Sequence, residues 1–383
     1  MFIVCGGNLP GHFALNRAIE CEGTCVRKSL TAVLATAFLT LGAASADPVA
    51  LTDQRGRQFE LAEPASRIVV IPLPMASVVM ALDGSSDRLV AIHPSARKSV
   101  EEGFLGKVFP GALELSTDVT RGGQFTPNLE SILALEPDAV IQWREPDNLL
   151  EPLDSAGLNA IGLINSPPNE EINQQNLAIV AKLIGRQDRL EQVLAWHDAA
   201  LASVQGVTDG MEPGLRPKAM YLHAAEERFR PAGANVYQDF WLTLAGGTNV
   251  AAAELRGMSA EVNAEQILAW NPDVIILGAF DAATPADIAA NPLLAETSAV
   301  KNKRVYKMPH GGYRWDPGSH ESHLTMQWAA MVMHPEEFDF DLRQAMRDSY
   351  RFFYNHALTE DEIDQILALN ENAGMAGYDR FTR

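Results

Sequence analysis

Cysteine is nearly absent from this 383-residue chain, and its three cysteines, Cys5, Cys21 and Cys25, all lie within the first 25 positions. The remainder of the chain therefore cannot form a disulfide. Known catalytic motifs are missing too, since there is no Gly-x-Ser-x-Gly nucleophile motif and no dinucleotide-binding glycine motif. The segment 320–323, His-Glu-Ser-His, is one residue shorter than the zinc-protease helix motif. These absences favour a protein without catalytic activity.

Basic residues are also few, with 30 Lys and Arg against 49 Asp and Glu, which gives a formal net charge of −19. Such a chain is repelled by nucleic acids and by anionic membrane surfaces, so we expect neither as a partner. The excess of carboxylates is explained by solubility, or by attraction of a cationic ligand or a basic partner surface. The sequence does not decide between these explanations.

The N-terminus has the pattern of a signal peptide. Arg27 and Lys28 precede an apolar run over 29–41, which is too short to span a bilayer, and Ala44-Ser45-Ala46 supplies a cleavage site before Asp47. Residues 1–25 are atypical of a signal peptide, which favours a translation start near Val26. Cleavage after residue 46 removes three basic and two acidic residues and every cysteine, so the mature chain has a charge of −20. We predict export to the periplasm without a lipid anchor.

One segment occurs twice. Residues 128–141, NLESILALEPDAVI, recur 135 positions later as NAEQILAWNPDVII over 263–276. Each copy combines a helical spacing of apolar residues, a Pro-Asp stop and a β-branched run, which predicts helix, turn and buried strand. A single repeat at this distance indicates two similar lobes, and a cleft between lobes is a common site for small ligands.

Short strands and amphipathic helices alternate along the chain, which predicts an α/β fold with largely parallel sheets covered by helices on both faces. Strands are expected over 67–72, 88–93, 139–143, 159–164, 218–223, 273–278 and 304–309. An uninterrupted amphipathic stretch predicts one long helix between the lobes. We divide the chain into a signal peptide (1–46), an N-terminal lobe (47–186), a connecting helix (187–205), a C-terminal lobe (206–340) and a helical extension (341–383), in which Thr359 and Glu362 form a capping box.

Several of these segments together resemble a known family, the substrate-binding proteins of ABC importers for iron–siderophores, haem, cobalamin and related metal species. The two repeats carry the resemblance, together with 52–57, 244–250, 300–306 and 334–338. The resemblance implies two Rossmann-like lobes joined by a rigid helix, no catalysis, no prosthetic group, and delivery of the ligand to a permease dimer.

Glu130 and Glu265 occupy the same place in the two repeats. On their own they are explained as glutamates near a helix start, where the helix dipole stabilises them. The resemblance implies instead that each lobe presents one carboxylate to an arginine of the permease, and two equal charges on similar lobes suit a two-fold partner.

Candidate ligand contacts follow the expected strands, because the carboxyl ends of strands in open α/β sheets face the ligand crevice. Trp143 and Arg144 follow one such strand, and the cobalamin binders of the family have a similar pair. The aromatic ring suits the face of a macrocycle or catechol, and the guanidinium suits an anionic chelate. In the second lobe the candidates are His223, Arg228, Arg230, Tyr237 and Trp241. Two weaker candidates, His93 and Arg121, lie in the first lobe.

The densest group of reactive side chains lies in the Gly- and Pro-rich loop 308–323. We predict ligand contacts from His310, Tyr313, Arg314 and Trp315, and metal contacts from His310, Tyr313 and His320, with His323 a weaker candidate. Ser319 is the expected N-cap of a helix over 320–333. The plainer alternative is that His320 and His323 are solvated residues of that helix and that Trp315 lies in the core.

The function predicted from the sequence is capture of an iron–siderophore or related metal chelate by a monomeric periplasmic protein. The alternatives are a receptor for a free transition-metal ion or small oxyanion and, in another class, an exported metal-dependent enzyme using His310, His320, Glu321 and His323.

Overall fold

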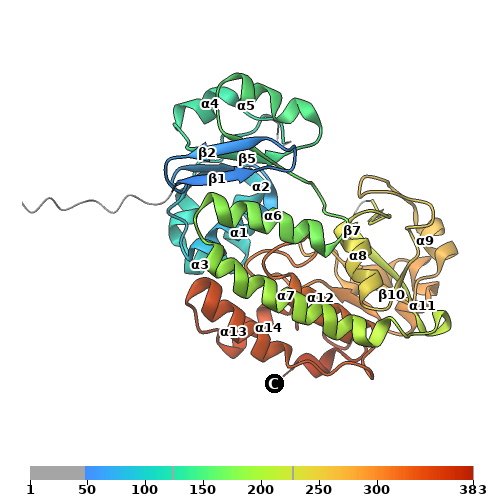
Figure 1. Cartoon of the computed structure of the whole chain (residues 1–383). Helices are drawn as coiled ribbons and strands as arrows, with labels where there is room; N and C mark the ends of the chain where they lie inside the picture. The colour runs from blue at the N-terminus through green and yellow to red at the C-terminus, as the bar shows by residue number, and fades with distance from the viewer. Residues whose placement is uncertain (1–47, 123–124, 227, 383) are drawn as a thin grey trace, which may run out of the picture. The chain divides into compact units, whose positions relative to one another are not determined.

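The computed structural model describes residues 48–122, 125–226 and 228–382. The predicted signal peptide lies outside these residues and stays a prediction. All seven segments expected to be strands contain one, and they form two separate sheets. The predicted fold class is confirmed: an α/β chain with two lobes joined by a long helix (Figure 1).

The first sheet has four parallel strands in the order β4-β3-β5-β6. The second has parallel strands in the order β11-β10-β7, extended by β8, which is antiparallel to β7, and by β9, which is parallel to it. Strands β1 and β2 form a third, two-stranded antiparallel sheet. The strands are β1 (Val49–Thr52), β2 (Gln58–Leu61), β3 (Ile68–Val70), β4 (Leu89–Ile92), β5 (Ala139–Trp143), β6 (Ala160–Leu163), β7 (Lys218–Ala224), β8 (Arg230–Pro231), β9 (Thr248–Asn249), β10 (Val274–Leu277) and β11 (Val305–Lys307).

Fourteen α-helices occur among the described residues. They are α1 (Leu73–Asp83), α2 (Pro94–Glu102), α3 (Leu105–Val108), α4 (Leu129–Ala134), α5 (Glu151–Ser155), α6 (Glu170–Leu183), α7 (Gln187–Thr208), α8 (Tyr237–Leu244), α9 (Ala264–Trp270), α10 (Pro285–Ala290), α11 (Ser298–Lys301), α12 (Ser322–Met333), α13 (Leu342–Tyr354) and α14 (Glu360–Ile366). None of the helices in this part of the chain combines the length and the apolar character that a membrane crossing needs.

The repeat forms the same unit in both lobes. Its helices are α4 and α9, and its strands β5 and β10 pair with β3 and β7 respectively. The Asp of each Pro-Asp stop makes the same hydrogen bond to the start of the neighbouring strand. Asp138 donates its backbone N–H to the Arg67 carbonyl before β3 at 2.8 Å. Asp273 donates its backbone N–H to the carbonyl of Lys218, the first residue of β7, at 2.7 Å. The repeated sequence therefore marks equivalent positions in two sheets.

Both faces of each sheet are buried, and alternate residues belong to different cores. In the first sheet Val69 and Val140 pack into a small core of their own lobe, whereas Ile68, Val70 and Ile141 face a large core. The second sheet repeats this arrangement. Because side chains alternate along a strand, helices on both sides require a continuous apolar sequence.

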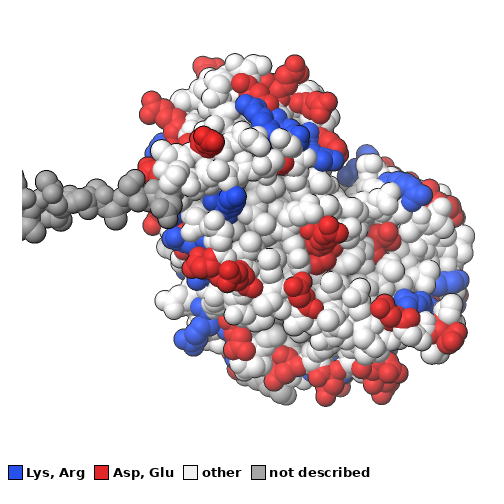
Figure 2. Space-filling model, viewed as in Figure 1, with Lys and Arg blue, Asp and Glu red and all other residues white. Residues whose placement is uncertain are grey.

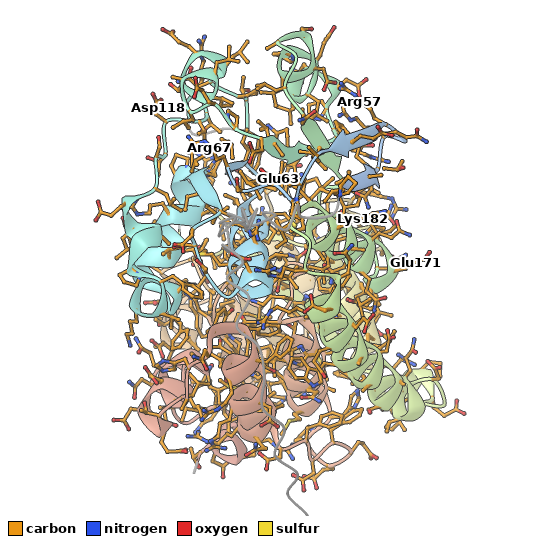
Figure 3. The ribbon with its side chains drawn as sticks, turned by 60° about the vertical axis from the view of Figure 1, so that its left-hand side comes forward. Arg57, Glu63, Arg67, Asp118, Glu171 and Lys182 are labelled. Atoms are coloured by element: carbon orange, nitrogen blue, oxygen red, sulfur yellow. The ribbon has the colours of Figure 1, made fainter. Side chains whose placement is uncertain are left out.

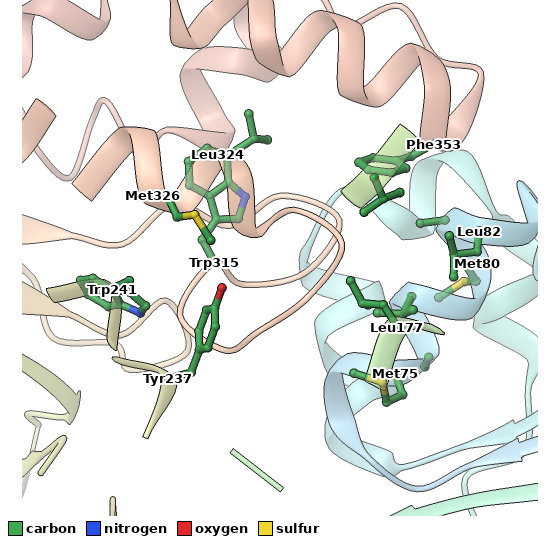
Figure 4. Close-up of a cluster of buried hydrophobic side chains, with 14 of the residues drawn as sticks. Met75, Met80, Leu82, Leu177, Tyr237, Trp241, Trp315, Leu324, Met326 and Phe353 are labelled. Carbon is green, nitrogen blue, oxygen red and sulfur yellow. The ribbon is translucent and has the colours of Figure 1, made fainter. Parts of the chain in front are cut away.

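The large core is shared by the two lobes. Figure 4 shows Met75 and Leu177 of the first lobe and Trp241 of the second within this one cluster. In chain order, helix α7 comes after the last strand of the first sheet and before the first strand of the second. It has 22 residues, and a rise of about 1.5 Å per residue makes it about 33 Å long. Acidic side chains are spread over the visible face of the molecule rather than gathered in one patch (Figure 2).

Candidate functional site

A cavity of about 780 Å³ lies between the two lobes. Its walls come from segments that follow the strands of both sheets: residues 73–75 follow β3, 165–167 follow β6, and Phe280 and Asp281 follow β10. Both sheets therefore direct the carboxyl ends of their strands toward one cavity, which is the arrangement expected for ligand binding in open α/β sheets.

Aromatic side chains line the cavity from both lobes. Trp143 at the end of β5 is 4% exposed, and its ring meets Phe125 edge-on at 6.4 Å. Its indole N–H has no hydrogen-bond partner among the described residues. Phe280 and Tyr237 lie on the wall of the second lobe. Flat apolar surfaces of this kind suit a ligand with rings of its own.

One buried arginine provides positive charge at the wall. The Arg314 side chain is 12% exposed and lies 4.8 Å from the centre of the Phe280 ring. Its Nε is 3.2 Å from the Asp316 carboxylate. Burial opposes the charge, but the Asp316 carboxylate, together with the phenol groups of Tyr313 and Tyr221, raises the pKa of Arg314 above its usual value. The cavity therefore holds a permanent cation next to an aromatic ring.

His223 lies at the end of β7 and also lines the cavity. Burial and the nearby Arg314 charge lower the pKa of His223, so the imidazole is neutral at neutral pH. Its Nδ1 has no hydrogen-bond partner within the described part of the chain. A neutral imidazole nitrogen can bind a ligand hydroxyl or a metal.

The other candidates of the second lobe are occupied by protein contacts. Arg228 and Arg230 both pair with Glu261, at 2.9 Å and 2.7 Å, and Arg230 alone of the two lines the cavity. Trp241 is fully buried, and its indole N–H donates to the Asp316 carbonyl. Tyr237 is also a residue of the cavity wall but is only 1% exposed, and its hydroxyl donates to a buried carboxylate.

Arg144 turns away from the cavity, although its neighbour Trp143 faces it. The guanidinium donates to the Gln54 carbonyl at 3.0 Å and pairs with Glu145 at 2.9 Å. His93, a weaker candidate, is the N-cap of α2, and its Nδ1 accepts from the Ser95 N–H at 3.0 Å. Arg121, another weaker candidate, is exposed.

Two of the three predicted metal residues have protein partners. His310 Nε2 lies 3.1 Å from the Ser99 hydroxyl, and His320 Nε2 lies 2.6 Å from the Tyr354 hydroxyl. Tyr313 is buried, with its hydroxyl unbonded within the described chain. Among the residues that the structure describes, no three His, Cys, Asp or Glu side chains are grouped as a metal site.

The helix after the loop begins later than predicted. Helix α12 spans Ser322–Met333, not 320–333, so Ser319 is not its N-cap. The Ser319 hydroxyl instead accepts from the N–H of Glu321 in the preceding turn. His320 therefore precedes the helix and is fully buried, and His323 in the first turn of α12 contacts Ser349 of α13 at 2.7 Å. Trp315 lies in the core, where its indole N–H donates to Glu321.

Glu130 and Glu265 are both exposed, each in the first turn of its repeat helix. The two carboxylates therefore occupy equivalent surface positions on the two lobes.

Several residues of the cavity wall were not predicted from the sequence. They are Phe125, Phe280, Asp281, Met258 and 165–167. A signal existed for Phe280 and Asp281, because they follow the second repeat strand just as Trp143 follows the first.

Comparison with known proteins assigns the family. Residues 68–310 match the family model described as periplasmic binding protein. The molybdate-binding protein MolA of Haemophilus influenzae is 24% identical over 332 residues, which cover 81% of this chain and 92% of MolA. The iron-uptake system-binding protein of Bacillus subtilis is 25% identical over 269 residues, covering 64% of this chain and 80% of that protein.

A solved structure agrees with these matches. The periplasmic solute binding protein from Veillonella parvula superimposes with a TM-score of 0.76 at 30% sequence identity, covering 86% of this chain and 99% of that one. The chain therefore belongs to the periplasmic binding protein family, whose members are solute-binding proteins of ABC transporters rather than enzymes.

Proposed function

We propose that the protein captures an organic metal chelate of the iron–siderophore type in the cleft and delivers it to an ABC permease. The observation that carries this proposal is the size and lining of the cavity. Sites for ligands of several hundred daltons have volumes of roughly 300–1,000 Å³ and mostly apolar walls with a few polar groups. The cavity of about 780 Å³, with aromatic residues on both walls and Arg314 beside Phe280, fits that description.

A second candidate is a small oxyanion. Similarity to the molybdate-binding protein MolA favours it, and Arg314 supplies the cationic partner that an oxyanion needs. A tetrahedral anion would fill a small part of the cavity, and the aromatic walls would have no role in binding it. These two points favour the chelate.

Calorimetric titration distinguishes the two ligands. A ferric tris-catecholate complex and sodium molybdate are each titrated into the mature protein and into a Trp143→Ala variant. Capture of a chelate predicts saturable binding of the ferric complex, weakened about tenfold or more by Trp143→Ala, since aromatic residues are frequent binding hot spots. Binding of molybdate alone, with equal affinity for both proteins, would favour the oxyanion.

For delivery, we propose that Glu130 and Glu265 dock the protein on the two permease subunits. Exposed charges at the edge of an interface control encounter and orientation more than they control the fold. The double variant Glu130→Arg/Glu265→Arg should abolish uptake and leave ligand affinity unchanged. The matched control is Glu151→Arg/Glu212→Arg, which reverses two other exposed glutamates. Equal uptake by both double variants would contradict the docking role.

We further propose that the protein is a monomer exported to the periplasm, with residues 1–46 removed. The mass of the secreted protein tests the cleavage site, because the mature chain should begin at Asp47.

A further inference from the structure

Beneath the cleft lies a carboxylate that the proposed function does not use. Glu170, the first residue of α6, is 3% exposed. Its neighbour Glu171 points outward from the same helix (Figure 3). A buried carboxylate is costly unless it is paired and hydrogen-bonded, so the partners of Glu170 reveal its role.

Three side chains from three helices bind Glu170. His197 of α7 approaches with its Nδ1 2.6 Å from Oε1. The Tyr237 hydroxyl, from α8 of the second lobe, donates to Oε2. Asn173 of α6 donates its side-chain N–H to both oxygens, at 3.1 Å and 3.2 Å. Glu170 is therefore the common acceptor of the first lobe, the connecting helix and the second lobe.

The geometry identifies the charge state of this cluster. The second ring nitrogen of His197, Nε2, lies 3.0 Å from the backbone carbonyl of His320. A carbonyl only accepts, so Nε2 carries a proton, and the contact with Glu170 holds another. Wherever that second proton lies along the 2.6 Å contact, the buried pair of Glu170 and His197 has no net charge. A buried pair with its remaining hydrogen bonds made is tolerated, whereas removing one partner leaves an uncompensated group.

This cluster adjoins the wall of the cleft. Tyr237 is one of the residues that line the cavity, although it is only 1% exposed, and its hydroxyl donates to Glu170. Gly318, a second-lobe residue of the cavity wall, packs so closely on Asn173 of the first lobe that a Cβ there would lie 2.5 Å from the amide oxygen. The two walls of the cleft therefore meet at Glu170 and its partners.

We propose that Glu170 and His197 are positioning residues for the ligand cleft: they hold the Tyr237 hydroxyl within the buried cluster, so that its phenol oxygen is not available to the ligand. Tyr237 then does not coordinate a metal in the ligand. This inference concerns the ligand-free protein and does not depend on which ligand is captured.

Fluorine NMR of the ligand-free mature protein labelled with 3-fluorotyrosine tests the proposal. The chain has seven tyrosines, all outside residues 1–46, and the Tyr237 signal is the one lost in Tyr237→Phe. Burial and the Glu170 carboxylate raise the pKa of Tyr237, so its signal should not move with pH in the range where a free fluorophenol titrates. The Tyr237 signal should shift in both Glu170→Gln and His197→Gln. In Glu170→Gln it should also titrate at a lower pH than in wild type, because the carboxylate that disfavours the phenolate is gone.

Two controls separate positioning from general loss of stability. Glu171→Gln neutralises the adjacent exposed glutamate, and Val204→Ala truncates a buried side chain farther along α7; both should keep the wild-type Tyr237 signal and titration. The proposal is overturned if the Tyr237 signal and its titration are unchanged in both Glu170→Gln and His197→Gln. If Glu170→Gln does not fold, His197→Gln alone decides, because it leaves the carboxylate in place.

Discussion

Replacing Glu321 with glutamine should change how the stability of the protein depends on pH. Glu321 is fully buried, and burial raises its pKa from 4.5 to about 7. Each of its oxygens accepts from groups of the loop that carries Arg314: Oε1 accepts from the Gly312 N–H at 3.2 Å, and Oε2 from the Trp315 indole at 3.2 Å. The carboxyl group therefore fixes the loop that brings a cation to the cleft.

The sign of the effect follows from proton binding. Between about pH 4.5 and 7 the unfolded chain has lost the Glu321 proton and the folded chain keeps it, so the stability falls as the pH rises through this range. The cost of a tenfold change in proton affinity is about 1.4 kcal/mol. From about pH 5 to pH 8, Glu321 should therefore reduce the free energy of unfolding by about 2.5 kcal/mol.

A glutamine cannot titrate, and it loses one acceptor. In either orientation its NH₂ group faces an N–H donor of the loop, which should cost about 1–3 kcal/mol at every pH. Urea unfolding of both proteins at several pH values measures the difference. Glu321→Gln should be clearly less stable near pH 5 and should recover about 2.5 kcal/mol relative to wild type near pH 8. A difference that is constant over this range would refute the reasoning.

Two further stability predictions concern the same region and the C-terminal helices. Gly312→Ala should lower the free energy of unfolding, measured by urea titration, by about 1–3 kcal/mol, because a Cβ there overlaps the Tyr354 hydroxyl. The control Gly210→Ala should have a much smaller effect in the same titration, because the space around Gly210 is open. Thr359→Ala should lower the free energy of unfolding by about 1 kcal/mol, because Thr359 is the N-cap of α14 and its hydroxyl accepts from the Glu362 N–H at 3.2 Å. An unchanged thermal unfolding midpoint would contradict this prediction.

The strands and the repeat were predictable because their signal is local. Both faces of the sheets are buried, so each strand is a continuous apolar run that sequence alone shows. The hairpin of β1 and β2 was not assigned to strands, because its residues alternate between buried and exposed and form no continuous apolar run. The start of α12 was wrong because Ser319 can cap a helix or close a turn, and the surrounding loop decides between them.

The cleft was predictable only in part. The strand-end rule located Trp143, His223 and Arg314, which all line the cavity. It does not give the direction of each side chain, and neighbouring residues at a strand end point to opposite sides. Arg144 therefore lies outside the cavity beside Trp143. The contact of Glu170 with Tyr237 joins residues 67 positions apart, and no local pattern in the sequence indicates it.

Native mass spectrometry of the protein purified from its own periplasm under metal limitation tests the proposed capture of a chelate most directly. The proposal predicts an added mass of several hundred daltons with the isotope pattern of a metal, and loss of that mass in Trp143→Ala. An added mass equal to molybdate or to one bare metal ion, retained in Trp143→Ala, would contradict it.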